Sequence, residues 1–158
     1  MLWLRALLFA LVVPGTFAGW LPVYLAAADD GPRFVTGPAR WLGAPLVLLG
    51  WIALGWCFVD FVRRGRGTPN PLDPPRELVV AGLYRYTRNP MYVGVLIAIA
   101  GFAILTGSRA LLPYAAAFWL VAHLFVLLYE EPALRRTFGP SYDRYHATVP
   151  RWLGRWRA

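Results

Sequence analysis

The side chains best suited to chemistry lie in two short segments of this chain. Arg88, Asn89 and Tyr92 surround the start of one apolar run, while Glu130 and Glu131 close the next one. Arg and carboxylate side chains both make strong charge-assisted hydrogen bonds. Two adjacent carboxylates at the end of a lipid-embedded helix are costly unless they are paired, hydrated or used in function. These five residues therefore form a candidate site, provided that the elements carrying them meet.

The composition of the chain places those elements in a membrane. Only 15% of the 158 residues are charged and 58% are apolar, whereas a water-soluble domain usually has about 25% charged residues. The excess apolar surface must face lipid. The formal charge is +8, with sixteen Arg and no Lys, and the hydropathy favours anionic lipid headgroups over nucleic acid as the partner. The single Cys57 excludes an intrachain disulfide and a Cys-rich metal site, and we predict no bound metal.

Four apolar runs are long enough to cross a bilayer, which takes roughly 17 to 25 residues. Backbone groups in lipid must satisfy their own hydrogen bonds, so each run predicts a helix. The third helix should begin near Pro90, because a first-turn position does not need the missing N–H. Only residues 106–109 separate the last two runs, which predicts a tight helical hairpin. We expect a single all-α, polytopic membrane domain over residues 1–158, with four transmembrane helices at about 2–28, 41–62, 88–107 and 110–130.

The distribution of Arg predicts the orientation of these spans. Thirteen of the sixteen arginines lie near the N-terminus, in the connector 63–87 with its junction to the third run, or in the tail 131–158. Arg-rich loops stay in the cytoplasm, so both termini and the site should be cytoplasmic. The first run also resembles a secretory signal with small residues at 26–28, but its length favours a retained span. The other spans keep the same orientation in either case.

The tail 131–158 has an amphipathic pattern typical of a segment lying on a membrane surface. Pro132 should bend or stop the fourth helix beside the carboxylates, because it cannot donate the next helical hydrogen bond. The hairpin then brings Arg88, Asn89 and Tyr92 close to Glu130 and Glu131. The residues expected on the apolar face of the tail are Leu134, Phe138, Tyr142, Tyr145 and Val149.

Four separated motifs, between about 77 and 152, resemble the isoprenylcysteine carboxyl methyltransferase and phospholipid methyltransferase group of integral membrane enzymes. They occur in the order of that group, around a short hairpin. The motifs are Gly82-Leu-Tyr84 with Arg88-Asn89-Pro90-Met-Tyr92-Val-Gly94, then Glu130-Glu131-Pro-Ala-Leu134, then Phe138-Gly139-Pro-Ser-Tyr142-Asp-Arg-Tyr145, and last Val149-Pro150-Arg151.

The resemblance implies that S-adenosylmethionine is the methyl donor and that the acceptor is a lipid-like or prenylated amphiphile reaching the site from the bilayer. It implies catalytic roles for Arg88 and Glu131. Asn89 stands where many members have His, and an amide cannot titrate near neutral pH, so a proton-transfer role there is not supported. The cofactor-binding residues implied are Arg88, Asn89, Pro90, Tyr92, Gly94, Glu130 and Glu131.

Two different functions remain open for the same residues. The chain could be an NADPH-dependent membrane reductase of the sterol-reductase type, or a non-enzymatic lipid-binding or assembly protein. Nothing in the sequence separates a prenylated carboxylate from a phospholipid amine as acceptor, or fixes the oligomeric state. Single residues could also have structural roles: a helix ion pair for Glu131 with Arg135, close helix packing for Gly94, an ion pair for Asp60, a bonded structural role for His123, and membrane anchoring for Trp152 and Trp156.

Overall fold

The computed structural model describes residues 2–67 and 75–152, and these residues form helices with no β-strand among them. The first helical rod comprises α1 (Leu2–Gly15), a π-helical turn (Thr16–Trp20) and α2 (Leu21–Ala27). A 3-10 turn (Gly37–Leu42) leads into α3 (Gly43–Arg63), and a second one (Gly82–Arg85) precedes α4 (Pro90–Thr106). The chain continues through α5 (Leu111–Phe125), a π-helical turn (Val126–Glu130), α6 (Glu131–Phe138) and α7 (Pro140–Thr148). The all-α prediction is confirmed for the described residues.

Three helices are long and apolar enough to cross a membrane, namely Leu2–Ala27, Gly37–Arg63 and Leu111–Phe138. Helix α4 is a shorter apolar helix of 17 residues, or about 25 Å at 1.5 Å per residue. That length falls a little short of a hydrocarbon core of about 30 Å. Three of the four expected spans therefore have spanning length, and the fourth span stays a prediction.

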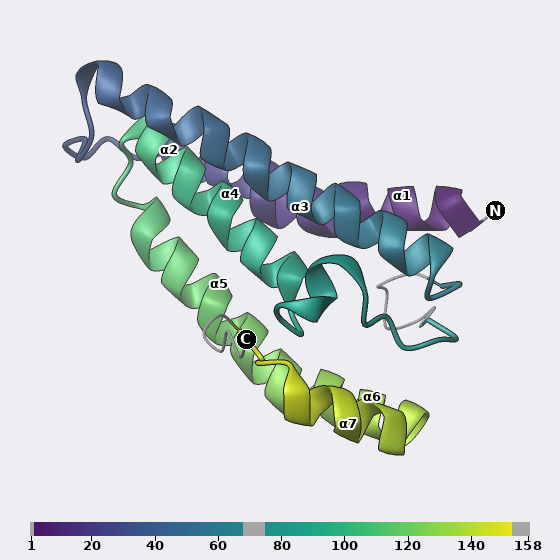
Figure 1. Cartoon of the computed structure of the whole chain (residues 1–158). Coiled ribbons are helices and arrows are strands. Elements are labelled where there is room, and N and C mark those ends of the chain that lie inside the picture. Colours follow the sequence, from purple (N-terminus) through teal and green to yellow (C-terminus); the bar gives the residue numbers. More distant parts are fainter. Residues whose placement is uncertain (1, 68–74, 153–158) are drawn as a thin grey trace.

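Helix α4 lies between α3 and α5, with the first helical rod packed alongside (Figure 1). Glycines let α3 and α4 approach closely. A Cβ built on Gly50 would lie 2.6 Å from the carbonyl oxygen of Gly94, and one on Gly43 would overlap the carbonyl oxygen of Gly101. Small residues at such crossings are typical of helix packing in membranes.

The ends of α4 follow from its flanking residues. Pro90 occupies the first helical position, as expected, after a non-helical Asn89. Gly107 ends the helix with a φ of 68°, a left-handed conformation that glycine adopts without a Cβ penalty. The chain then turns within a few residues into α5, so the predicted helical hairpin is confirmed.

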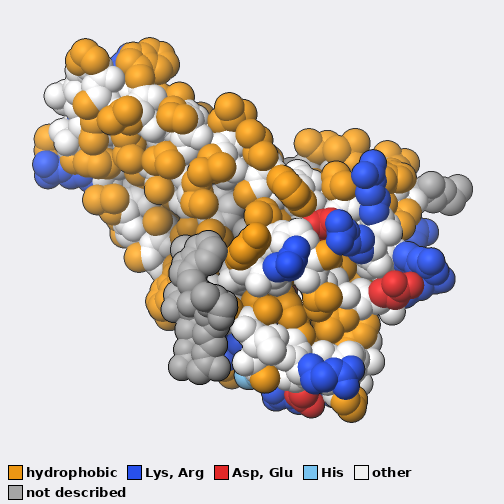
Figure 2. Space-filling model, viewed as in Figure 1, with side chains coloured by type: hydrophobic (Ala, Val, Ile, Leu, Met, Phe, Trp, Pro, Cys, Tyr) orange, Lys and Arg blue, Asp and Glu red, His pale blue; other side chains and the backbone are white. Residues whose placement is uncertain are grey.

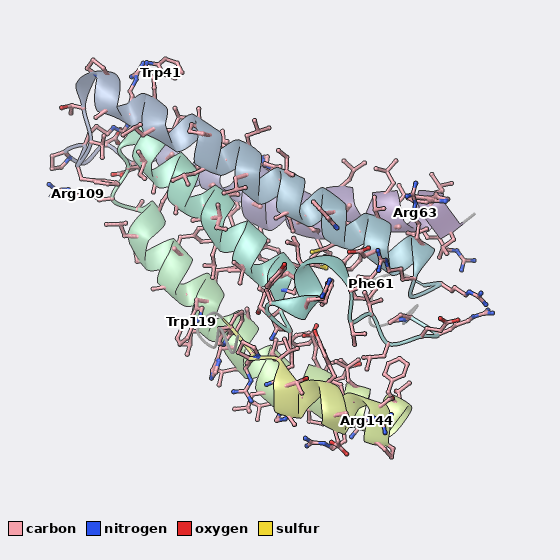
Figure 3. The ribbon with its side chains drawn as sticks, viewed as in Figure 1. Trp41, Phe61, Arg63, Arg109, Trp119 and Arg144 are labelled. Carbon is pink, nitrogen blue, oxygen red and sulfur yellow. The ribbon has the colours of Figure 1, made fainter. Side chains whose placement is uncertain are left out.

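Apolar side chains cover the helical bundle, and most charged side chains gather at one end of it (Figure 2). Trp41 and Arg109 lie at the opposite end from Arg63 and Arg144 (Figure 3). Large exposed apolar residues occur on the first rod, on α3 and on α5, including Leu11, Ile52 and Val121. This distribution is the one a lipid-embedded bundle needs, with a polar cap formed by α6, α7 and the segment before α4.

Candidate functional site

The two segments singled out from the sequence meet at the polar end of the bundle. The Tyr92 hydroxyl on α4 donates a 2.8 Å hydrogen bond to Oε1 of Glu130. Arg88, just before α4, places Nη1 2.9 Å from Oε1 of Glu131. The helical hairpin thus brings together residues about forty positions apart, as the sequence indicated.

A π-helical turn explains how neighbouring carboxylates point to different partners. Of the two outcomes expected at Pro132, a bend or a stop of the fourth helix, the stop does not occur. The helix continues to Phe138, and the N–H of Glu131 donates to the carbonyl of Val126 across a widened turn. Such turns often accompany functional sites. Here Glu130 contacts α4, while Glu131 contacts the C-terminal segment.

Glu131 is the centre of a buried ion-pair cluster. Arg151 forks onto it, with Nε 2.7 Å from Oε1 and Nη2 2.9 Å from Oε2. Nη1 of Arg88 contacts the same Oε1, and Nε2 of His146 lies 3.9 Å from Oε2. The side chains of Arg88 and Glu131 are 8% and 9% exposed. Bidentate Arg–carboxylate pairs combine strength with fixed geometry, so this cluster is rigid.

The segment 149–152, which we call the tail strap, closes the site over α4. The carbonyl of Arg151 accepts hydrogen bonds from Nδ2 of Asn89 at 2.9 Å and from Oγ1 of Thr87 at 3.0 Å. The N–H of Arg88 donates to the carbonyl of Pro150 at 2.9 Å. Asn89 therefore holds the strap through its amide, a use that does not require a titrating side chain.

The expectation that the tail lies with its aromatic face on the membrane surface is wrong for Tyr142 and Tyr145. These residues are 1% and 9% exposed and pack inward. The Tyr145 hydroxyl donates to the carbonyl of Tyr84 at 2.7 Å, and the Tyr142 hydroxyl accepts from Nη1 of Arg88 at 3.2 Å. Both hydroxyls have hydrogen-bond partners inside the protein, so these two rings pack against the protein and not against lipid.

Trp152 also turns inward. Its Nε1 donates to Nδ1 of His123 at 3.1 Å, and its ring packs against those of Trp119 and Tyr92. The hydrogen bond expected for His123 is therefore confirmed, and its structural role stays a prediction. The contacts of Trp152 do not indicate a free anchoring role. Trp156 lies outside the described residues.

A pocket with about 220 Å³ of space, open solvent included, lies between the segment before α4, the π-helical turn, α6 and α7. Its polar lining contains Glu130, whose Oε1 is bonded by Tyr92 and which makes no ion pair with a described residue. It also contains Arg88, whose Nε is buried with no hydrogen-bond partner in the described part of the chain. A buried donor without an acceptor is costly. The full lining is Arg88, Asn89, Val126, Glu130, Glu131, Leu134, Tyr142 and Tyr145.

The electrostatics of the tail follow from burial and from the arginines. Burial and the nearby Arg88 guanidinium lower the pKa of His146, although Glu131 acts in the opposite direction. His146 is therefore neutral near pH 7. Burial raises the pKa of Tyr142, with Glu131 adding to the effect, so its phenol stays protonated and can accept from Arg88 through oxygen.

Gly94 lies away from this pocket. A Cβ there would meet Gly50 and Leu54 of α3, at 3.2 and 3.3 Å, so the contacts are those of helix packing. Pro90 starts α4 and does not line the pocket. A role for either residue in cofactor binding stays a prediction.

Ion pairs with a nearby Arg on the same helix were expected for Glu131 and Asp60, and the structure shows such a pair for Asp60 alone of the two. Arg135 pairs with Asp143 through Nε at 2.8 Å, whereas Glu131 is bound by Arg88 and Arg151. The helix pair expected between Glu131 and Arg135 is therefore replaced by pairs across the fold. Asp60 pairs with Arg64 at 3.0 Å, as expected.

Four residues of the site were missed by sequence reasoning as functional candidates: Thr87, Tyr142, Tyr145 and Arg151. The last three did stand in the motifs that carried the resemblance. That position in the motifs was the available signal, since hydropathy alone gave them a surface role.

The chain is similar in sequence to known methyltransferases. A family model described as phospholipid methyltransferase matches residues 38–141. A relative from Uncinocarpus reesii is 29% identical over 113 residues, covering 65% of this chain and 11% of the relative. One from Botryotinia fuckeliana is 32% identical over 108 residues, covering 62% and 10%. One from Arthroderma benhamiae is 27% identical over 117 residues, covering 63% and 11%. All three are named phosphatidylethanolamine N-methyltransferase.

The chain thus spans about a tenth of the length of these curated relatives. No solved structure matches it significantly. The family match ends at residue 141, so it contains the two carboxylates and the start of α4 but not the tail strap.

Proposed function

Because the chain belongs to the phospholipid methyltransferase family, we propose that it transfers a methyl group from S-adenosylmethionine to the headgroup amine of a membrane phospholipid. The names of its relatives support a phospholipid amine as acceptor, in preference to the prenylated carboxylate that the sequence left open. The proposed enzyme is an integral membrane protein in which α4 provides a fourth span and the site faces the cytoplasm.

The single observation that carries this proposal is the pair of open polar groups in the pocket. Arg88 offers a buried donor without an acceptor, and Glu130 offers a carboxylate without a cationic partner among the described residues. The methionine part of S-adenosylmethionine carries one carboxylate and one ammonium group. Arg88 would bind the carboxylate and Glu130 the ammonium through charge-assisted hydrogen bonds. The residues present therefore fit this cofactor.

The remaining lining suits the rest of the cofactor. Tyr92, which bonds Glu130, and Tyr142, which lines the pocket, bring aromatic rings to the site, and such rings attract a sulfonium cation. The space of about 220 Å³ in the pocket includes solvent at its open side. The amino-acid end of the cofactor would enter the pocket, and the nucleoside would extend towards that open side.

When bound, S-adenosylmethionine supplies an activated methyl group on its sulfonium. The residues of the chain need only hold the cofactor in line with the acceptor and keep water away, since positioning and desolvation supply much of the acceleration of a displacement. Asn89 serves this purpose by holding the tail strap in place. Glu131 serves it by fixing Arg88.

The proposal is tested on detergent-purified protein by calorimetric titration with S-adenosylhomocysteine and by transfer of labelled methyl to lipid micelles. Wild type should bind S-adenosylhomocysteine and methylate phosphatidylethanolamine. Glu130→Gln should weaken binding, while Glu77→Gln, at an exposed ion pair with Arg66, should not.

Each competing function has its own signature in the same experiment. Binding of NADPH in place of S-adenosylhomocysteine would indicate a reductase. Methylation of a prenylated cysteine carboxylate, with none of phosphatidylethanolamine, would reassign the acceptor. A folded protein that binds neither S-adenosylhomocysteine nor NADPH and methylates neither acceptor would support a non-enzymatic lipid-binding role.

A further inference from the structure

The ion-pair cluster at Glu131 contains one more guanidinium group than it needs. We infer that Arg151 is a positioning residue that holds both oxygens of Glu131 and thereby leaves Nε of Arg88 available to bind the carboxylate of the cofactor. This inference rests on the proposed function. Arg151 lies beyond the segment that the family model matches, so the argument depends on this chain's own contacts.

The geometry of the fork is the first step. Arg151 uses Nε and Nη2 on the two separate oxygens of Glu131, at 2.7 and 2.9 Å. This is the bidentate arrangement that Arg prefers with a carboxylate. An arginine that arrives second can reach the same carboxylate only from the side.

Arg88 is that second arginine. It contacts Glu131 through Nη1 alone, and the same nitrogen donates to the Tyr142 hydroxyl. Its Nε is buried with no partner among the described residues. Without Arg151, Arg88 could rotate and bind Glu131 through two nitrogens. Its Nε would then donate to Glu131 and would not be available to a ligand.

Charge leads to the same result. Two guanidinium groups face one carboxylate in this cluster, which leaves one positive charge uncompensated within it. Two further titratable groups pack against the cluster: His146, near Glu131, is neutral near pH 7, and the Tyr142 phenol, which accepts from Arg88, is protonated. Glu130 faces the same pocket but is bonded by Tyr92 on the α4 side. The separated positive and negative groups match a zwitterion.

The tail strap fixes Arg151 before any ligand arrives. Its carbonyl accepts from Asn89 and Thr87, and the neighbouring carbonyl of Pro150 accepts from the N–H of Arg88. The residue that frees Arg88 is thus tied to the backbone of Arg88 itself. Such preorganisation lowers the cost of ordering the site when the ligand binds.

A chemical double-mutant cycle tests this inference. Dissociation constants are measured for S-adenosylhomocysteine and for its decarboxylated analogue, in wild type, Arg151→Gln, Arg151→Lys and the exposed-tail control Arg144→Gln. In wild type and in Arg144→Gln, loss of the carboxylate should weaken binding roughly tenfold or more, as expected for a hydrogen bond to a charged group. In Arg151→Gln that ratio should fall to about twofold, because Arg88 has turned to Glu131.

A purely structural role gives a different pattern. If Arg151→Gln weakens both ligands equally and keeps the wild-type ratio, Arg151 only stabilises the fold and the inference is wrong. Tighter binding of S-adenosylhomocysteine by Arg151→Gln would also overturn it, since the strap would then be an obstruction. Arg151→Lys keeps the charge but loses the fork, so its ratio should lie between the two.

Should Arg151→Gln fail to fold, Arg151→Lys decides, and a wild-type ratio there overturns the inference. If wild type binds S-adenosylhomocysteine and the decarboxylated analogue equally well, the inference about Arg151 is wrong while the proposed function stands. A folded wild type that binds neither ligand overturns the proposed function together with it.

Discussion

Tyr92 and Glu130 are joined by a 2.8 Å hydrogen bond, although 38 residues separate them in the chain. Tyr92 lies on the first turns of α4, and Glu130 ends the π-helical turn after α5. The bond spans the open end of the helical hairpin, where α4 and the continuation of α5 approach the pocket. It therefore fixes the carboxylate that we propose binds the ammonium group of the cofactor.

Replacing Tyr92 with Phe tests whether this bond matters for activity. The ring would keep its contacts with Trp152 and Phe118, whose centroids lie 6.3 and 6.5 Å away. The carboxylate would lose its donor, and kcat/KM for methyl transfer should fall roughly tenfold, the range of a hydrogen bond to a charged group. Tyr129→Phe, on the same π-helical turn but exposed, is the control and should retain wild-type activity. If Tyr92→Phe and Tyr129→Phe are equally active, the hydrogen bond between Tyr92 and Glu130 does not contribute to methyl transfer.

The helices could be predicted from the sequence because lipid leaves the backbone few choices. The apolar runs, the start of α4 at Pro90 and the hairpin before α5 each follow from local composition. The π-helical turn does not. It brings Glu130 to Tyr92 of α4 and Glu131 to Arg151 of the tail strap, and the sequence offered only Pro132 as a warning of irregularity. The helix continues past that proline through the wider turn, in which the N–H of Glu131 donates to the carbonyl of Val126.

The site was predicted only as far as its two polar segments. The tail strap was missed because a segment rich in Trp and Arg has the same sequence pattern whether it anchors the chain to lipid or folds against the protein. Arg151 reaches Glu131 across twenty residues, past Gly139 with a φ of 49°. That turn changes the direction of the chain, so a single helical periodicity could not place Tyr142 or Arg151.

Gly50 should be intolerant of a side chain because it sits against the backbone of α4. A Cβ there would lie 2.6 Å from the carbonyl of Gly94 and 2.7 Å from the N–H nitrogen of Ala98. Gly50→Ala should force the helices apart and lower the free energy of unfolding by about 1 to 3 kcal/mol. Gly55, on the same helix with open space around its Cβ position, is the matched control. Thermal unfolding in detergent should find Gly55→Ala neutral or slightly more stable, and equal losses would contradict the close crossing.

Asp29 gives the fold a pH dependence at the end of the bundle remote from the site. Its carboxylate accepts from the Ser108 hydroxyl and from the N–H groups of Gly31 and Ala110. These bonds, led by that of Ser108, lower the pKa of Asp29 from 3.8 to about 2. Because the pKa is lower in the folded state, the stabilisation is complete above about pH 4 and is lost as the pH falls towards 2.

The measurement is thermal unfolding of wild type and Asp29→Asn in detergent between pH 7 and pH 2. Asp29→Asn should melt at a lower temperature at pH 7, and the difference from wild type should shrink below about pH 4. The exposed neighbour provides the control, since Asp30→Asn should leave both the melting temperature and its pH profile near wild type. A constant difference at every pH would mean that Asp29 does not act through its charge.

The orientation proposed from the arginines can be tested with single cysteines, because the native Cys57 is buried and should stay unreactive. Asp30 and Arg144 are exposed and lie at opposite ends of the bundle, in the loop after α2 and on α7. If the Arg-rich end is cytoplasmic, a membrane-impermeant maleimide added to intact cells should label Asp30→Cys but not Arg144→Cys. Permeabilised cells should show labelling of both. Labelling of Arg144→Cys from outside would reverse the orientation and move the proposed methyl-transfer site away from the cytoplasm.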